Sequence, residues 1–140
     1  MSCDVPRLRI ASMSLLCEGC CLLARHDDLL LPLVHKIWSP LLARMRDKNP
    51  AVVEKAFELF AVLANCSRTF IRSRASTDLM NTLVVFLERG ASVSLGEPAS
   101  YEFLTACRVQ RRLLQTLGPL CVQVGLYHIC DRLHCSIPSI

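Results

Sequence analysis

The sequence of 140 residues has little glycine and few aromatic side chains, and it lacks the common catalytic motifs. Its five glycines suit bends, helix caps and loops, and none builds a glycine-rich phosphate loop. The motifs G-x-S-x-G and H-E-x-x-H are absent as well. We therefore predict no catalytic residue, no cofactor and no small-molecule substrate, and we expect a protein that is not an enzyme.

The sequence has neither a large excess of one charge nor a long apolar run. The net charge of +4 is too small to indicate a nucleic-acid-binding protein, which would gather basic residues on one face. The longest uncharged run, 113–130, contains glycine, proline, glutamine and histidine and would make a poor bilayer helix. Asp4 and Glu18 argue against a signal peptide at the N-terminus. We expect no nucleic acid or membrane partner, and a soluble protein of the cytoplasm, with the nucleus as a second location.

Cysteine, in contrast, is abundant, and its nine residues are an odd number that cannot all pair. Most lie within apolar helical patterns, where a free thiol behaves as a small hydrophobic side chain, so a reducing compartment is the simpler interpretation. Cys17, Cys20 and Cys21 form a C-x-x-C-C motif. Its first spacing suits zinc ligands, but positions i, i+3 and i+4 of an apolar helix are typical of core thiols. We predict no metal site, and a small metal or redox protein remains the less favoured alternative.

Apolar residues from Leu30 to Met45 follow a helical period. Steps of three and one residues continue straight through Pro40, which indicates one amphipathic helix over 28–46 with a kink. We expect Asp28 to be the N-cap of this helix, so that Pro32 costs no backbone hydrogen bond. Trp38 is expected in the core, and His35 in a packing or interface position rather than as a base.

A second helix is expected over 50–64. Asn49 is a favourable N-cap, and Pro50 suits the first helical position because its fixed φ is already helical. Apolar surface covers most of the circumference, so this helix needs neighbours on both sides. The expected core side carries Val53, Ala56, Phe57, Phe60, Leu63 and Ala64, flanked by Val52, Leu59 and Val62, and the polar strip carries Glu54, Lys55 and Glu58.

Repetition in the chain indicates a solenoid. Pro6 and Pro50 open similar stretches and lie 44 residues apart, within the period of about 40–47 residues of HEAT and armadillo repeats. No segment shows the alternation of a strand. We predict an all-α fold, an α-solenoid of HEAT-type helix hairpins with about two and a half repeats. Further helices are expected over 6–24, 77–89 and 101–117, with a partly helical connector over 65–76, a helix cap at Gly90 and a bend at Gly118 and Pro119.

The repeat segment is expected over residues 1–126, followed by a divergent C-terminal tail over 127–140. The first helix is apolar nearly all round, whereas the ends of a solenoid need polar capping repeats. We therefore expect the chain to be a fragment or an isoform, or another chain to cover its ends.

Five stretches carry a more specific likeness: "LLPLVHKIWSPLLARM", "NPAVVEKAFELFAVLA", "FIRSR", "DLMNTLVVFL" and "LLQTLGPLC". In this order and spacing they resemble the C-terminal HEAT region of the Tel-two-interacting protein one family, over about residues 28–121. The resemblance implies a non-enzymatic scaffold of the TTT co-chaperone complex, which works with the Hsp90 machinery on phosphatidylinositol-3-kinase-related kinases. The implied partners are the other TTT subunits, adaptors linked to Hsp90 and these kinases. A HEAT adaptor of another class, such as a transport or phosphatase scaffold, is the alternative.

Six arginines are the candidates for partner binding. A basic ridge that meets an acidic partner surface is the functional interpretation. A solvated edge, or arginines that bond the carbonyls at helix ends, is the simpler one, because surface charges contribute little. The candidates are Arg68, Arg72 and Arg74, followed by Arg108, Arg111 and Arg112 on a later helix.

The exposed strip of this later helix is expected to include Thr105, Arg108, Arg111 and Gln115. Its expected inward residues are Phe103, Ala106, Cys107, Leu113, Leu114 and Leu117.

Overall fold

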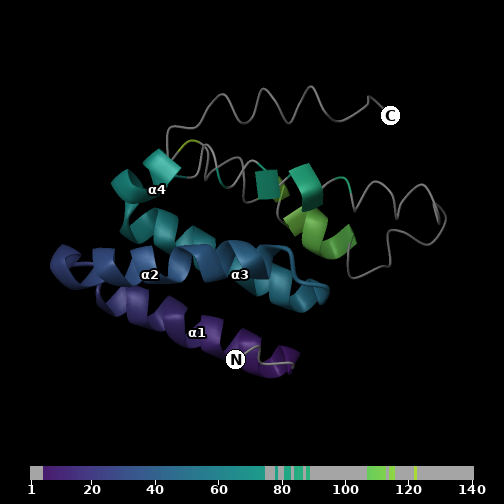
Figure 1. Cartoon of the computed structure of the whole chain (residues 1–140), viewed down its shortest axis with the longest axis horizontal. Coiled ribbons are helices and arrows are strands. Elements are labelled where there is room, and N and C mark those ends of the chain that lie inside the picture. Colours follow the sequence, from purple (N-terminus) through teal and green to yellow (C-terminus); the bar gives the residue numbers. More distant parts are fainter. Residues whose placement is uncertain are drawn as a thin grey trace.

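The regular structure of the chain is helical throughout the described residues. The computed structural model describes residues 5–74, 78, 81–82, 84–86, 88, 107–112, 114–115 and 122. Four helices have defined bounds: α1 (Pro6–Leu22), α2 (Asp27–Met45), α3 (Pro50–Cys66) and the short α4 (Arg68–Arg74) (Figure 1). The predicted all-α fold is confirmed, and α1, α2 and α3 match the expected helices to within about one turn.

The predictions for the second half of the chain fall only partly within the described residues. Residues 81–82, 84–86 and 88 are helical, as are 107–112 and 114–115, in agreement with the two helices expected there. The short helix α4 lies in the connector, where some helical content was expected. The cap at Gly90, the bend at Gly118 and Pro119, and the tail over 127–140 lie outside the described residues.

The start of α3 agrees with the sequence pattern. Pro50 occupies the first turn, and the side chain of Asn49 accepts a hydrogen bond of 3.0 Å from the backbone N–H of Ala51. This bond satisfies one of the donors that a helix N-terminus leaves without a partner. The predicted N-cap is therefore confirmed.

The start of α2 differs from the prediction. His26 is the N-cap, and its carbonyl accepts the first helical bond, 2.9 Å, from the N–H of Leu30. Asp28 was predicted as the N-cap, which is wrong; it lies in the first turn, where the helix dipole favours negative charge. Pro32 consequently lies inside the helix, and its missing N–H removes the bond to the Asp28 carbonyl. The helix also continues through Pro40, as expected.

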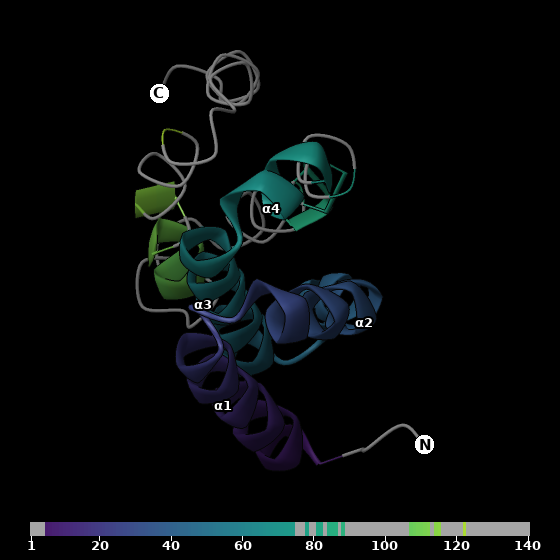
Figure 2. The same cartoon turned by 90° about the vertical axis from the view of Figure 1, so that its left-hand side faces the viewer.

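The core is centred on α3, which packs against α1, α2 and α4. Figure 2 shows α2 to one side of the α1–α3 pair. Trp38 of α2 is 2% exposed and lies against Phe60 of α3, with ring centroids 6.3 Å apart, so its predicted core position is confirmed. The predicted core side of α3 is confirmed as well, except that Phe57 and Val62 are half-buried. The buried residues of α3 are Val52, Val53, Ala56, Leu59, Phe60, Leu63 and Ala64.

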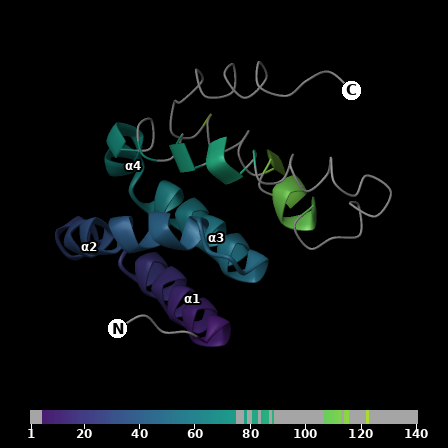
Figure 3. The ribbon, with the colours of Figure 1, turned by 45° about the vertical axis from the view of Figure 1, so that its right-hand side comes forward.

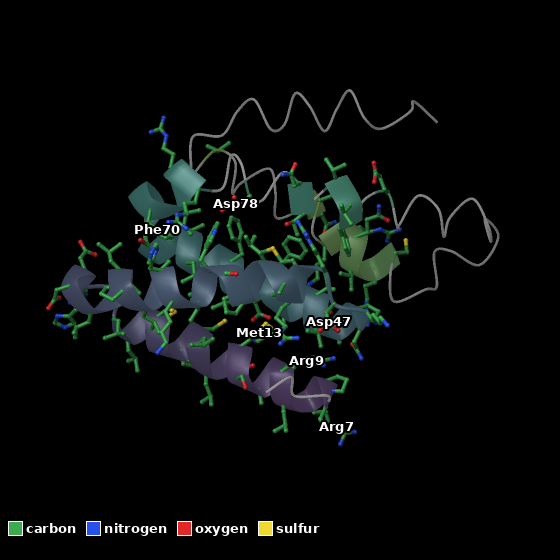
Figure 4. All side chains as sticks on the ribbon, viewed as in Figure 1. Arg7, Arg9, Met13, Asp47, Phe70 and Asp78 are labelled. Carbon is green, nitrogen blue, oxygen red and sulfur yellow. The ribbon has the colours of Figure 1, made fainter. Side chains whose placement is uncertain are left out.

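An ion pair holds α1 against the loop that precedes α3. Arg9 contacts both carboxylate oxygens of Asp47, with Nε 3.2 Å from Oδ2 and Nη2 3.3 Å from Oδ1. In Figure 4, Arg9 is directed toward Asp47, whereas Arg7 points away. Asp47 also accepts a bond of 3.0 Å from the N–H of Asn49. Because the side chains of Arg9 and Asp47 are only 14% and 8% exposed, water screens this pair less than an open surface pair.

The stack of helices continues beyond α4. Trp38 Nε1 donates a bond of 2.9 Å to Asp78 Oδ2, and Arg46 Nη2 donates one of 3.2 Å to Thr82 Oγ1. The ring of Phe86 lies 5.8 Å from that of Phe57 on α3. The helical residues between 78 and 88 therefore pack on α2 and α3, as a following repeat would. No helix within the described residues is long and apolar enough to cross a bilayer.

Candidate protein-interaction surface

Helix α1 has one covered side and one open side. Met13, Cys17 and Cys20 are buried against the core. On the open side, Leu8, Leu15 and Leu22 are 55%, 74% and 80% exposed. Their spacing of seven residues brings them onto one side of the helix, and we call them the outer leucine row. Figure 3 shows α1 at one end of the stack of described helices.

The corresponding side of α3 is buried. When the sequence is shifted by 44 residues, Pro6 falls on Pro50, Leu8 on Val52 and Leu15 on Leu59. Val52 and Leu59 are only 0% and 1% exposed. The positions are equivalent in the repeat and differ in whether a neighbouring helix covers them.

The neighbour that covers this side of α3 is α1. Helices α1 and α3 pack against each other. The charge of Lys55 acts on the pKa of the Cys17 thiol of α1, and Leu59 lies one turn after Lys55 on the same side of α3. The other side of α3 carries Phe57, which meets the following segment at Phe86. Each second helix of a repeat thus has one face for the preceding helix and one for the following helix. The outer leucine row occupies the first of these faces.

The six predicted arginines fall into two separate groups. Arg72 is exposed, and the guanidinium of Arg74 lies 5.4 Å from the ring centroid of Phe70 in a cation–π contact. The side chain of Arg68 lies outside the described residues. In the second group, Arg108 and Arg111 are exposed, and Arg112 forms an ion pair with Glu54.

The two arginine groups lie at opposite ends of α3. Glu54, which holds Arg112, is near the start of α3, whereas α4 begins just after its last residue, Cys66. At 1.5 Å per residue the separation along the helix is about 20 Å. The structure does not bring the six arginines into one ridge, and a binding role for either group stays a prediction.

The polar strip of α3 and the exposed strip of the later helix agree only in part with the prediction. Glu58 is exposed, but Glu54 and Lys55 are half-buried, and Lys55 pairs with Glu58 at 3.1 Å. Arg108, Arg111 and Gln115 are exposed as predicted, while Thr105 lies outside the described residues.

The inward side of the later helix also differs from the prediction. Cys107 is buried as expected, but Leu114 is 38% exposed, so its predicted inward position is wrong. Val109, which was not expected to face inward, is buried, with 2% of its surface exposed. Phe103, Ala106, Leu113 and Leu117 lie outside the described side chains. A depression of about 440 Å³ on this helix is lined by Cys107, Gln110, Arg111, Leu114 and Gln115.

The cysteines of α1 behave mostly as core thiols. Cys17 and Cys20 are buried, and burial raises the pKa of the Cys20 thiol to about 11. Cys21 is exposed, so its expected core position is wrong. Across the part of the chain that the structure describes, no group of three or more histidine, cysteine or acidic side chains could hold a metal ion. His35 is exposed and packs edge-on against Phe70, with ring centroids 5.9 Å apart.

These features define a class, the α-helical repeat proteins, in which each repeat packs on its neighbours in the stack. Comparison with known families gives the particular family. Residues 1–130 match the TTI1 C-terminal TPR domain, and the chain belongs to this family. The resemblance found in the sequence is thereby confirmed. A TPR unit has about 34 residues, whereas α1 and α3 start 44 residues apart, a spacing closer to that of HEAT repeats.

Two relatives support the same assignment. The chain is 32% identical over 120 residues to TELO2-interacting protein 1 homolog of Mus musculus, and equally to that of Homo sapiens. The aligned part is 86% of this chain and 11% of each relative, so the chain spans about a tenth of the length of these proteins. No solved structure matches the chain.

Proposed function

We propose that the chain is a non-enzymatic scaffold that binds helical partner proteins through the outer leucine row of α1. The observation that carries this proposal is the exposure of Leu8 and Leu15 at positions whose counterparts on α3, Val52 and Leu59, are buried, with the exposed Leu22 continuing the same row. Burying one leucine side chain contributes about 1.5–3 kcal/mol, so covering the row would favour partner binding.

The partners follow from the family. The relatives are named as proteins that interact with TELO2, and we assign the same partner to this chain. Within a TTT-type complex the chain would work with the other TTT subunits and with adaptors linked to Hsp90. The proposed outcome is the maturation of phosphatidylinositol-3-kinase-related kinases in the cytoplasm and the nucleus.

The exposed arginines are a secondary part of this proposal. Arg72, Arg108 and Arg111 are open to solvent, and guanidinium groups form paired hydrogen bonds with carboxylates. We assign them contacts with acidic surfaces of the partners. Exposed ion pairs are individually worth about 0–1 kcal/mol, so these contacts adjust orientation more than affinity.

Binding of the purified full chain to purified TELO2 tests the proposal directly. The triple variant Leu8→Gln, Leu15→Gln, Leu22→Gln is expected to weaken binding at least about tenfold, a loss of about 1.4 kcal/mol. The matched control is Val84→Gln, Val85→Gln, which changes side chains that are 39% and 38% exposed elsewhere on the molecule. Circular dichroism checks that both variants keep their helices.

The outcomes separate the parts of the proposal. Loss of TELO2 binding in the leucine variant alone supports the surface and the partner. Equal binding by the leucine variant and the unmodified chain would contradict the role of α1. Failure of the unmodified chain to bind TELO2 would contradict the assigned partner and favour an adaptor of another class.

A further inference from the structure

The outer leucine row is one half of a longer pattern on the open side of α1. Three smaller residues also recur every seven positions, each three residues before a leucine of the row. Of these, Val5 is 48% exposed, Ser12 is exposed and Gly19 is half-buried. The combined steps of three and four residues are the pattern by which two helices pack side by side. We call the six residues the α1 seam: Val5, Leu8, Ser12, Leu15, Gly19 and Leu22.

The seam alternates between large and small side chains. A Cβ atom on Gly19 would meet no other part of the chain within 4 Å, so packing inside the molecule does not require a glycine there. A glycine in a helix interior also weakens the helix. The small residues therefore leave room beside the leucines that the fold of the described chain does not use. Helix α1 lies at one end of the described helices, where a second molecule can approach it (Figure 3).

A second copy of the seam complements the first when the two α1 helices run antiparallel. Such a pair has twofold symmetry, and the same surface of each copy forms the contact. Each leucine can then lie opposite a smaller residue of the other copy, as a knob opposite a hole. The facing pairs are Leu8 with Gly19, Leu15 with Ser12, and Leu22 with Val5.

The exposed charges of α1 favour the antiparallel direction. Arg7 lies near the start of the helix and Glu18 near its end, and both are exposed, whereas Arg9 is engaged by Asp47. Antiparallel packing brings Glu18 of one copy opposite Ala11 of the other, one turn from Arg7. Parallel packing would instead set arginine against arginine and glutamate against glutamate, and such like-charge contacts oppose association.

We propose that the α1 seam is the interface of a reversible homodimer, in which the seams of two copies of this chain pack antiparallel. Each copy contributes a single helix, so the contact is small and the dimer forms only at high protein concentration. The dimer covers the outer leucine row and would therefore compete with a partner protein. That competition rests on the proposed function, whereas formation of the dimer does not.

Sedimentation equilibrium of the purified full chain tests the dimer without any partner. We expect the average mass to rise from 15.7 kDa toward twice this value as the concentration approaches about 1 mM. Leu15→Gln should raise the dissociation constant at least about tenfold, whereas the control Val84→Gln, Val85→Gln should leave it unchanged. A chain that stays monomeric over the whole series, or one that dimerises equally well with Leu15→Gln, would overturn the proposal.

Two complementary variants test the antiparallel pairing. Leu8→Glu and Gly19→Lys should each weaken self-association at least about tenfold, because each sets a charge against an uncharged residue of the seam. When they are mixed, the new carboxylate faces the new ammonium group at one end, and Leu8 faces Gly19 at the other. The mixture should therefore dimerise more tightly than either variant alone. The open space at Gly19 admits the lysine, and circular dichroism checks that both variants keep their helices.

A second mixture distinguishes the parallel arrangement. Leu8→Glu mixed with Leu8→Lys should stay weak, because antiparallel seams do not bring the two positions together. Restored association in this mixture, or none in the mixture of Leu8→Glu with Gly19→Lys, would overturn the proposed pairing.

Discussion

Helices α1 and α3 are two copies of one element in different surroundings. Each has 17 residues and starts with a proline, and their starts lie 44 residues apart. Yet α3 buries seven residues and α1 only three. Leu15 is 74% exposed, whereas its counterpart Leu59 is 1% exposed.

The difference shows that the neighbours of a helix decide its burial. Both helices carry apolar residues over most of their circumference, so neither sequence marks which side stays open. Helix α3 lies between α1 and the following segment that contains Phe86. Helix α1 has a described neighbour only on its inner side. Among the described residues, no helix covers its outer leucine row, and three pairs of variants can test that comparison.

The largest effect is expected in the core of α3. Phe60 is 1% exposed and contacts Trp38, so Phe60→Ala should lower the free energy of unfolding by about 3–5 kcal/mol. Urea denaturation followed by circular dichroism measures the change. The matched variant Leu15→Ala on α1 should stay within about 0.5 kcal/mol of the unmodified chain. A large loss for Leu15→Ala would mean that the outer leucine row is covered in the isolated chain.

An intermediate effect is expected at the ion pair that joins α1 to the α2–α3 loop. Asp47→Ala removes the partner of Arg9 and the acceptor of the Asn49 N–H, and should cost about 2 kcal/mol in the same assay. Glu58→Ala breaks the more exposed pair with Lys55 and should cost at most about 0.5 kcal/mol. If the two variants lost similar amounts, the greater burial of Asp47 would have no energetic consequence.

The smallest effect is expected at the helix caps. Asn49 caps α3 with its side chain, whereas Val5, its counterpart in the repeat, gives α1 no side-chain cap. Asn49→Ala should cost about 1 kcal/mol, and Val5→Asn should stabilise α1 by a comparable or smaller amount. Thermal unfolding measures both, with Asn49→Asp as a control that keeps the cap. A destabilising Val5→Asn would indicate that Val5 contributes through packing.

Much of the fold was predictable from local patterns. The period of the apolar residues locates α2 and α3, and Asn49 followed by Pro50 marks where α3 begins, because capping and proline act within a few residues. The same local rules failed at Asp28, because α2 begins two residues earlier, with His26 as its cap. They also failed at Leu114, where the choice between two apolar sides depends on what packs nearby.

The sequence by itself determined the all-α class, the 44-residue repeat and the family, since helical periodicity and motif order are properties of the chain alone. Only the tertiary structure decided which apolar side of α1 is open and which arginines stand apart. The physical reason is that burial and contact depend on residues far away in the chain. A helix that is apolar nearly all round does not itself specify which of its sides will be covered.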